Sequence, residues 1–107
     1  MTHIDKLTSK IFLNNINMTV PWYLMAAYAY YQEDNPIWSD DFFDRTAKLM
    51  SRRWDDIEHF HKHLIKKDDL EAGSYLGEYP NRVIGGLESV RKEYFTKAGS
   101  VKAKYLK

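Results

Sequence analysis

Apolar residues recur at intervals of three or four along most of this chain, the spacing of one face of an α-helix. No strand pattern competes with this spacing anywhere, so the sequence predicts an all-α fold of four to five helices. A first short helix is expected over about residues 4–13. It ends at Asn14-Asn15-Ile16-Asn17, because asparagine side chains compete with the helix for local backbone hydrogen bonds.

The second predicted helix is apolar or aromatic on every side. Thr19 lies near its cap and Pro21 in its first turn, and it runs to about Glu33. Asn35-Pro36 then stops it, because proline disfavours helical backbone in the residue before it. A helix that is apolar all round is expected to be buried or covered by a partner.

The third predicted helix begins at Ser39, a typical N-cap, with acidic residues in its first turn. Its core stripe is spaced four, three and four: Phe43, Ala47, Met50 and Trp54. Apolar residues at helical spacing continue beyond that stripe: Ile57, Phe60, Leu64 and Ile65. Helical periodicity therefore continues toward residue 65. A bend or break near Arg52-Arg53 is compatible with this pattern, which does not reveal whether it occurs.

In the C-terminal part, residues 66–69 are predicted to form a boundary between elements. A loop with one helical turn is expected over residues 70–80, and a last helix over residues 81–97. The apolar stripe of this last helix is Val83, Leu87, Val90 and Tyr94. Gly85 and Gly86 lie within it, where each glycine costs about 1 kcal/mol relative to alanine. Close packing or a dimer contact would each account for them.

Length and composition narrow the class of protein. The 107 residues are expected to form a single domain, and the absence of cysteine excludes disulfides and thiolate metal sites. The N-terminus shows no signal peptide, and no segment reaches the roughly 20 apolar residues that a membrane span needs. We therefore expect a cytoplasmic protein without membrane contact.

Charge is nearly balanced overall, at +1, but it is unevenly distributed. Residues 33–44 carry five acids and no base, whereas residues 91–107 carry six bases and one acid. The basic stretch 98–107 is expected to be a frayed tail, although such a tail can also touch phosphate or an acidic protein. Nucleic acid is the least favoured partner, because the whole chain is almost neutral.

Candidate ligand-binding residues gather where the second and third predicted helices meet. Asp40 and Asp44 are four residues apart with Phe43 between them in angle, so all three point roughly one way. Tyr30 and Tyr31 lie just across the proline-containing turn. The two helices would form a hairpin, and these five residues would line its open end, here called the hairpin mouth. Such a mouth suits a nicotinamide nucleotide. Rings stack on the flat base and attract its positive charge, and carboxylates accept hydrogen bonds from its carboxamide and ribose.

Three motifs stand in fixed order within residues 22–50: the pair Tyr30-Tyr31, the turn Asp34-Asn35-Pro36, and Asp40-Asp41-Phe42-Phe43-Asp44. In this order the segment resembles the helix–turn–helix motif of the N-terminal Ia domain of bacterial NAD-dependent DNA ligases. That domain grips the nicotinamide mononucleotide half of NAD during enzyme adenylation. The resemblance implies nucleotide contacts from Tyr30, Tyr31, Asp40, Phe43 and Asp44. Two positions depart from the family, which has a tyrosine in place of Phe43 and frequently Tyr-His in place of Tyr30-Tyr31.

Catalysis is not expected from this chain. The ligases transfer AMP through a lysine in a Lys-x-Asp-Gly motif, and this sequence contains neither that motif nor zinc-binding cysteines. The first hypothesis is a non-catalytic binder of NAD or nicotinamide mononucleotide. The alternative is a protein-interaction module, such as a phage-encoded modulator or inhibitor of a host enzyme or defence complex. It would have a host protein partner or form a homodimer.

The run His59-Phe60-His61-Lys62-His63 invites a metal hypothesis. On a helix, His59 and His63 would share a face, with Asp55 one turn before them, and that spacing can hold zinc. A fourth ligand is not obvious, and the glutamate of a His-Glu-x-x-His site is absent. We therefore expect a polar surface here and no metal.

Overall fold

The computed structural model describes residues 3–75 and 77–96 of the chain. Five α-helices lie in this part of the chain: α1 (His3–Asn14), α2 (Thr19–Tyr31), α3 (Asp40–Arg52), α4 (Lys67–Ala72) and α5 (Asn81–Arg91). Single 3-10 turns cover Ile16–Met18, Trp54–Asp56 and Lys62–Leu64, and a π-helical turn covers Lys92–Thr96. The described residues contain no strand, which confirms the predicted small all-α fold and its helix–turn–helix hairpin, α2–α3. The predicted basic tail, 98–107, lies outside them.

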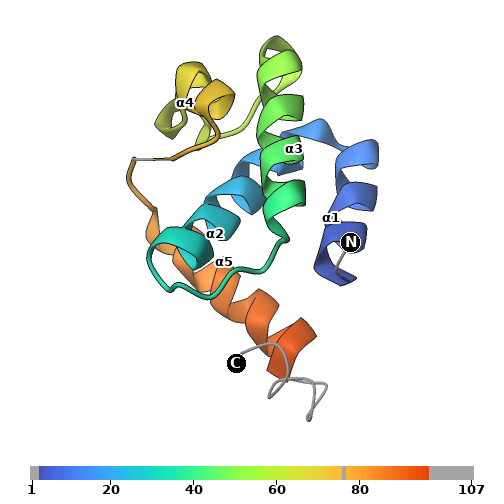
Figure 1. Cartoon of the computed structure of the whole chain (residues 1–107), viewed down its shortest axis with the longest axis vertical. Helices are drawn as coiled ribbons and strands as arrows, with labels where there is room; N and C mark the ends of the chain where they lie inside the picture. The colour runs from blue at the N-terminus through green and yellow to red at the C-terminus, as the bar shows by residue number, and fades with distance from the viewer. Residues whose placement is uncertain (1–2, 76, 97–107) are drawn as a thin grey trace.

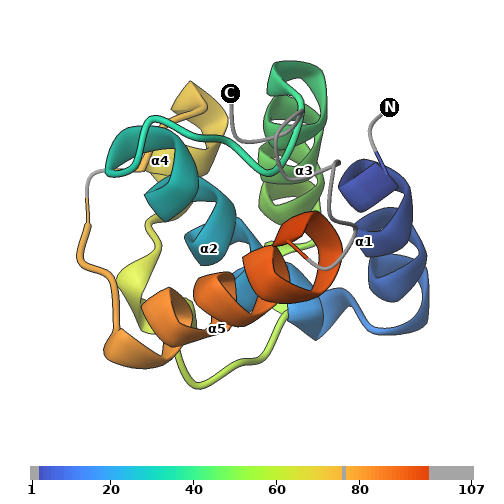
Figure 2. The same ribbon diagram turned by 90° about the horizontal axis from the view of Figure 1, so that it is seen from below.

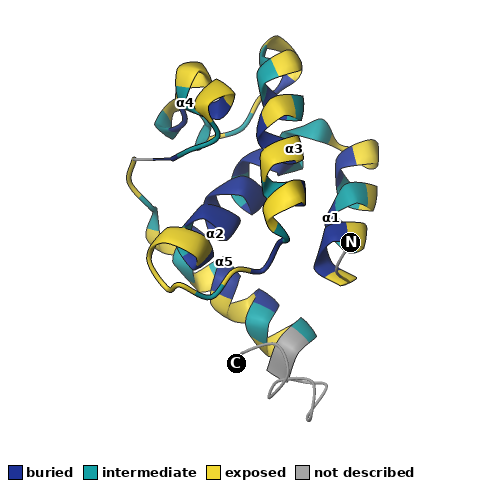
Figure 3. Ribbon diagram, viewed as in Figure 1, coloured by how far each residue is buried: buried dark blue, intermediate teal, exposed yellow. Residues whose placement is uncertain are grey.

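Helix α2 is the centre of the fold, with the other four helices around it (Figures 1 and 2). Nearly all of its surface is covered, as Figure 3 shows. Its buried residues are Thr19, Val20, Trp22, Tyr23, Leu24, Met25, Ala26, Ala27 and Ala29. The all-round apolar pattern therefore predicted burial correctly, although the helix ends at Tyr31, two residues earlier than expected.

Of the two glycines inside α5, Gly85 and Gly86, close packing of α5 on α2 explains why a glycine stands at position 86. A Cβ atom added at Gly86 would lie only 3.1 Å from the Sδ atom of Met25, whereas a Cβ at Gly85 would meet nothing within 4 Å. The small residue at position 86 thus lets the two helices approach each other. The stripe on the same helix is confirmed by the burial of Val83, Leu87 and Val90.

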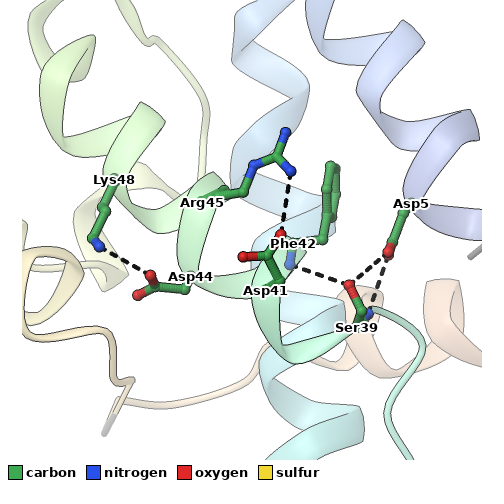
Figure 4. Close-up of polar contacts among 7 residues, drawn as sticks. All are labelled: Asp5, Ser39, Asp41, Phe42, Asp44, Arg45 and Lys48. Atoms are coloured by element: carbon green, nitrogen blue, oxygen red, sulfur yellow. Dashed lines mark hydrogen bonds and ion pairs between the residues drawn. The ribbon is translucent and has the colours of Figure 1, made fainter. Parts of the chain in front are cut away.

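The start of α3 is tied to α1 by a buried carboxylate (Figure 4). Asp5 is fully buried, and its two oxygens accept hydrogen bonds from the backbone N–H (3.2 Å) and the hydroxyl (2.7 Å) of Ser39. The Ser39 hydroxyl oxygen accepts in turn from the backbone N–H of Phe42 at 3.2 Å. The predicted N-cap is therefore confirmed, and a contact 34 residues away in sequence holds it in place.

The core stripe predicted for α3 is only partly right. Ala47 and Met50 are buried as expected, but Phe42 takes the deep position and Phe43 is half-buried. The reason is that α3 packs on two sides. The Phe42 ring lies 5.0 Å from Trp38 and 6.4 Å from Phe12 of α1, whereas Phe43 faces α2.

Helix α3 ends at Arg52, so the chain breaks where the pattern allowed a break, and the periodicity beyond it does not mark a continuing helix. The following chain turns through 3-10 and extended backbone, from which Ile57 and Ile65 are buried while Phe60 is 82% exposed. The Arg53 side chain donates to Asp56 at 2.7 Å and helps to close the first of these turns. Ile57 and Ile65 are therefore buried separately by a non-helical chain, and their helical spacing in the sequence is a coincidence.

The remaining boundaries shift by small amounts. Helix α4 begins within the predicted boundary at residues 66–69 and ends at Ala72, where the following Gly73 caps it with a left-handed φ of 73°. Helix α5 ends at Arg91 and continues as the π-helical turn, and Lys97 lies outside the described residues. Of the helices in the described part of the chain, none has the length and apolar content required to cross a membrane.

Candidate functional site

Three aromatic rings meet at the mouth of the α2–α3 hairpin. Tyr30 and Tyr31 are the last residues of α2, and their ring centroids lie 4.9 Å apart in an edge-to-face arrangement. Phe43 of α3 lies 5.8 Å from Tyr30 and 6.4 Å from Tyr31. The two tyrosines are 41% and 39% exposed, so the structure brings all three predicted rings into one cluster with an open surface.

The turn that joins the two helices is fixed by α5. The Arg91 guanidinium donates to the Glu33 carboxylate at 2.8 Å and also to the backbone carbonyl of Asn35. Asp34 adopts a left-handed φ of 51°, which aspartate tolerates better than most residues. The chain then inserts Trp38, which is only 4% exposed, into the core. The hydrogen bonds of Arg91 and the burial of Trp38 thus fix the turn between α2 and α3.

The two predicted carboxylates differ in their surroundings. Asp40 is exposed at the first position of α3 and makes no hydrogen bond or ion pair with the described residues. Asp44 pairs with Lys48 at 3.0 Å (Figure 4). Its other oxygen lies beside Gly73, where an added Cβ would be 3.4 Å away. Both carboxylates remain available to a ligand, because an exposed ion pair of this kind contributes little.

The segment after α4 forms a wall beside α2 and α3. The sequence analysis did not identify this segment as part of the site. The Tyr75 ring lies 5.2 Å from Tyr79, and the Tyr23 ring lies 5.1 Å from Phe43. The Tyr23 hydroxyl donates to the carbonyl of Ser74 at 3.4 Å. The only signal in the sequence was a pair of tyrosines within a glycine-containing loop.

The pKa values of the two phenols in this segment lie above the ordinary value. Burial is the main cause that raises the pKa of Tyr75 to about 12, with Glu78 and Asp69 adding to it. Burial, followed by Tyr75 and Tyr31, likewise raises the pKa of Tyr79 to about 12. The Tyr79 ring lies 5.0 Å from Tyr28 of α2, which places this wall against the helix that carries Tyr30 and Tyr31. Tyr75 is buried and its hydroxyl donates to the backbone carbonyl of Glu78, whereas Tyr79 is half-buried and borders the surface.

Two hollows lie away from this mouth. The larger, of about 770 Å³, is bordered by α1 and α3, and the smaller, of about 340 Å³, by Pro21, Arg82 and the loop around Phe60. None of the five predicted ligand-binding residues lines either hollow. The mouth is therefore an open aromatic surface, distinct from both hollows.

The histidine run does not form a helix, which corrects the geometry assumed for a metal site. The backbone N–H of His61 donates to Nδ1 of His59 at 3.0 Å, and a 3-10 turn begins at Lys62. Within residues 3–75 and 77–96, no group of three histidine, cysteine, aspartate or glutamate side chains is placed to hold a metal ion. Partial burial and the neighbouring His61 lower the pKa of His59 below its ordinary value.

Comparison of the chain with protein-family models, with curated proteins and with solved structures finds no match.

Proposed function

We propose that this chain is a non-catalytic protein that binds the nicotinamide mononucleotide half of NAD at the mouth of the α2–α3 hairpin. One observation supports the proposal above all others: Tyr30, Tyr31 and Phe43 form a single cluster that leaves two tyrosines more than a third exposed. Large aromatic side chains gain most when they are buried. A partly open group of three such rings is a surface on which a flat base can stack.

The carboxylates of Asp40 and Asp44 would supply the polar contacts to the nicotinamide nucleotide. The oxidised nicotinamide ring is positively charged, so aromatic faces and nearby carboxylates attract it. Asp40 has no competing partner among the described residues, and the Asp44–Lys48 pair is about half exposed on both sides. Ribose hydroxyls and the carboxamide N–H of the ligand can therefore replace water or lysine at these oxygens without a large loss.

The resemblance to the ligase Ia domain implies the same five residues and the same half of NAD. The chain lacks the Lys-x-Asp-Gly motif through which those ligases transfer AMP. Binding without chemistry is consistent with both the resemblance and the missing motif. It also predicts that NAD binds no less well than its mononucleotide, because no contact to the adenosine half is required.

Calorimetric titration with nicotinamide mononucleotide tests the proposal. The double variant Asp40→Ala/Asp44→Ala is expected to bind at least about tenfold more weakly, since a hydrogen bond to a charged group contributes about 1.5–3 kcal/mol. The matched control is Asp41→Ala, which removes an exposed carboxylate from the same turn, one that pairs with Arg45 at 3.2 Å. It should bind like the unaltered chain. Absence of heat at millimolar ligand, or equal binding by the double variant, would refute the proposal.

A further inference from the structure

A groove between α1 and α3 is lined by none of the five residues proposed to bind the nucleotide. The two helices lie side by side and run in the same direction (Figure 1), and the Asp5–Ser39 contact ties their N-terminal ends. Further along, toward Asn14 on one helix and Arg53 on the other, they border the hollow of about 770 Å³. Cavities of about 300–1,000 Å³ are typical of ligand sites in proteins.

The floor and one edge of this groove are apolar. Phe12 and Phe42 line it and are almost fully buried, and Ile16 and Leu49 line it and are half-buried. Leu13 also lines it and is 86% exposed. A single exposed leucine on a protein surface is ordinary. A leucine that extends an apolar groove into solvent provides a contact for an apolar side chain of a partner.

The other edge is basic. Arg45, Lys48, Arg52 and Arg53 line the groove, and its lining includes no carboxylate-bearing residue. Three of these cations make ion pairs with aspartates outside the groove, at 3.2, 3.0 and 2.7 Å, and all three pairs are about half exposed. Exposed pairs contribute about 0–1 kcal/mol each, so carboxylates of a partner can replace them. Arg52 makes no ion pair within the described part of the chain.

We propose that the α1–α3 groove binds an acidic amphipathic helix of a partner protein. Helices commonly bind in grooves through apolar side chains at intervals of three and four residues. Here those side chains would contact Leu13, Ile16 and Leu49, while glutamates or aspartates on the flank would pair with Arg45 and Arg52. Nucleic acid fits less well, because both rings that line the groove are buried and offer no face for stacking bases.

Fluorescence anisotropy of the full chain with a labelled, capped peptide tests this inference. The peptide places leucines at helical spacing and glutamates at the flanking positions. Saturable binding is expected that weakens with salt. Arg45→Ala/Arg52→Ala should weaken it about tenfold or more, since alanine substitution of interface arginines has effects of this size. Both arginines are exposed, so this variant is expected to fold. Lys67→Ala, an exposed cation outside the groove, is the matched control and should leave binding unchanged.

A second pair of variants tests the apolar edge. Leu13→Ser should weaken the peptide severalfold, whereas Phe60→Ser should not, because Phe60 is equally exposed (82%) but does not line this groove. Three results would overturn the inference. They are absence of binding, equal binding of a peptide with glutamine in place of glutamate, and an equal loss in both serine variants. Tighter binding of a single-stranded oligonucleotide through the same two arginines would also overturn it and would assign the groove to nucleic acid.

Discussion

The contact between Asp5 and Ser39 allows a stability prediction with a defined size. Alanine at position 5 removes two hydrogen bonds that a fully buried carboxylate accepts, at 3.2 and 2.7 Å, and leaves the Ser39 donors without this acceptor. Hydrogen bonds to a charged group contribute about 1.5–3 kcal/mol each, so the free energy of unfolding should fall by roughly 3 kcal/mol or more. Domains of this size are stable by about 5–15 kcal/mol, so the loss is a large fraction.

Urea denaturation, followed by tryptophan fluorescence, measures this effect, and Trp38 lies next to the altered cap. The control is Asp41→Ala, whose carboxylate makes only an exposed pair with Arg45 and should cost no more than about 0.5 kcal/mol. Asp5→Asn keeps one acceptor oxygen and should lie between the two. An Asp5→Ala variant as stable as Asp41→Ala would show that this tie does not hold α3 in place.

Two further predictions follow from packing and burial. Gly85→Ala should raise the free energy of unfolding by about 1 kcal/mol. Gly86→Ala should gain less or lose stability, because its Cβ would lie 3.1 Å from Met25, and equal gains in urea denaturation would contradict the close packing of α5 on α2. Burial raises the pKa of Tyr75 and of Tyr79 to about 12 from an unfolded value of 10, so their contribution to stability is complete below pH 10 and is lost as the pH rises through 12. Alkaline titration should therefore show late phenolate absorbance accompanied by loss of helical circular dichroism, and ordinary titration of all tyrosines in a folded chain would contradict it.

The sequence predicted those parts of the fold that depend on local chemistry. Ser39 was readable as a cap because its hydroxyl reaches an N–H only three residues away. The buried centre was readable from α2, whose apolar residues leave no polar face. The aromatic cluster at the hairpin mouth also depends on residues close together in the sequence. Tyr30, Tyr31 and Phe43 lie within fourteen positions, so a single turn between two helices brings them together.

The parts that could not be predicted depend on contacts between distant residues. Nothing local distinguishes Phe42 from Phe43, because the difference between them depends on the distant residues they contact, Phe12 of α1 for Phe42 and Tyr23 of α2 for Phe43. The carboxylate of Asp5 reads as an ordinary acid of a first helical turn until Ser39 lies beside it. The break after Arg52 has no glycine or proline to announce it.

Titration followed by amide NMR tests whether the hairpin mouth accepts a nicotinamide ring. On addition of nicotinamide mononucleotide, we expect saturable shifts confined to the end of α2, the first turns of α3 and the segment after α4. The N-terminal side of the α1–α3 groove, which includes Phe12, Leu13 and Ile16, should be unaffected and serves as an internal reference. An unchanged spectrum at millimolar ligand, or shifts that map to the groove alone, would contradict the account.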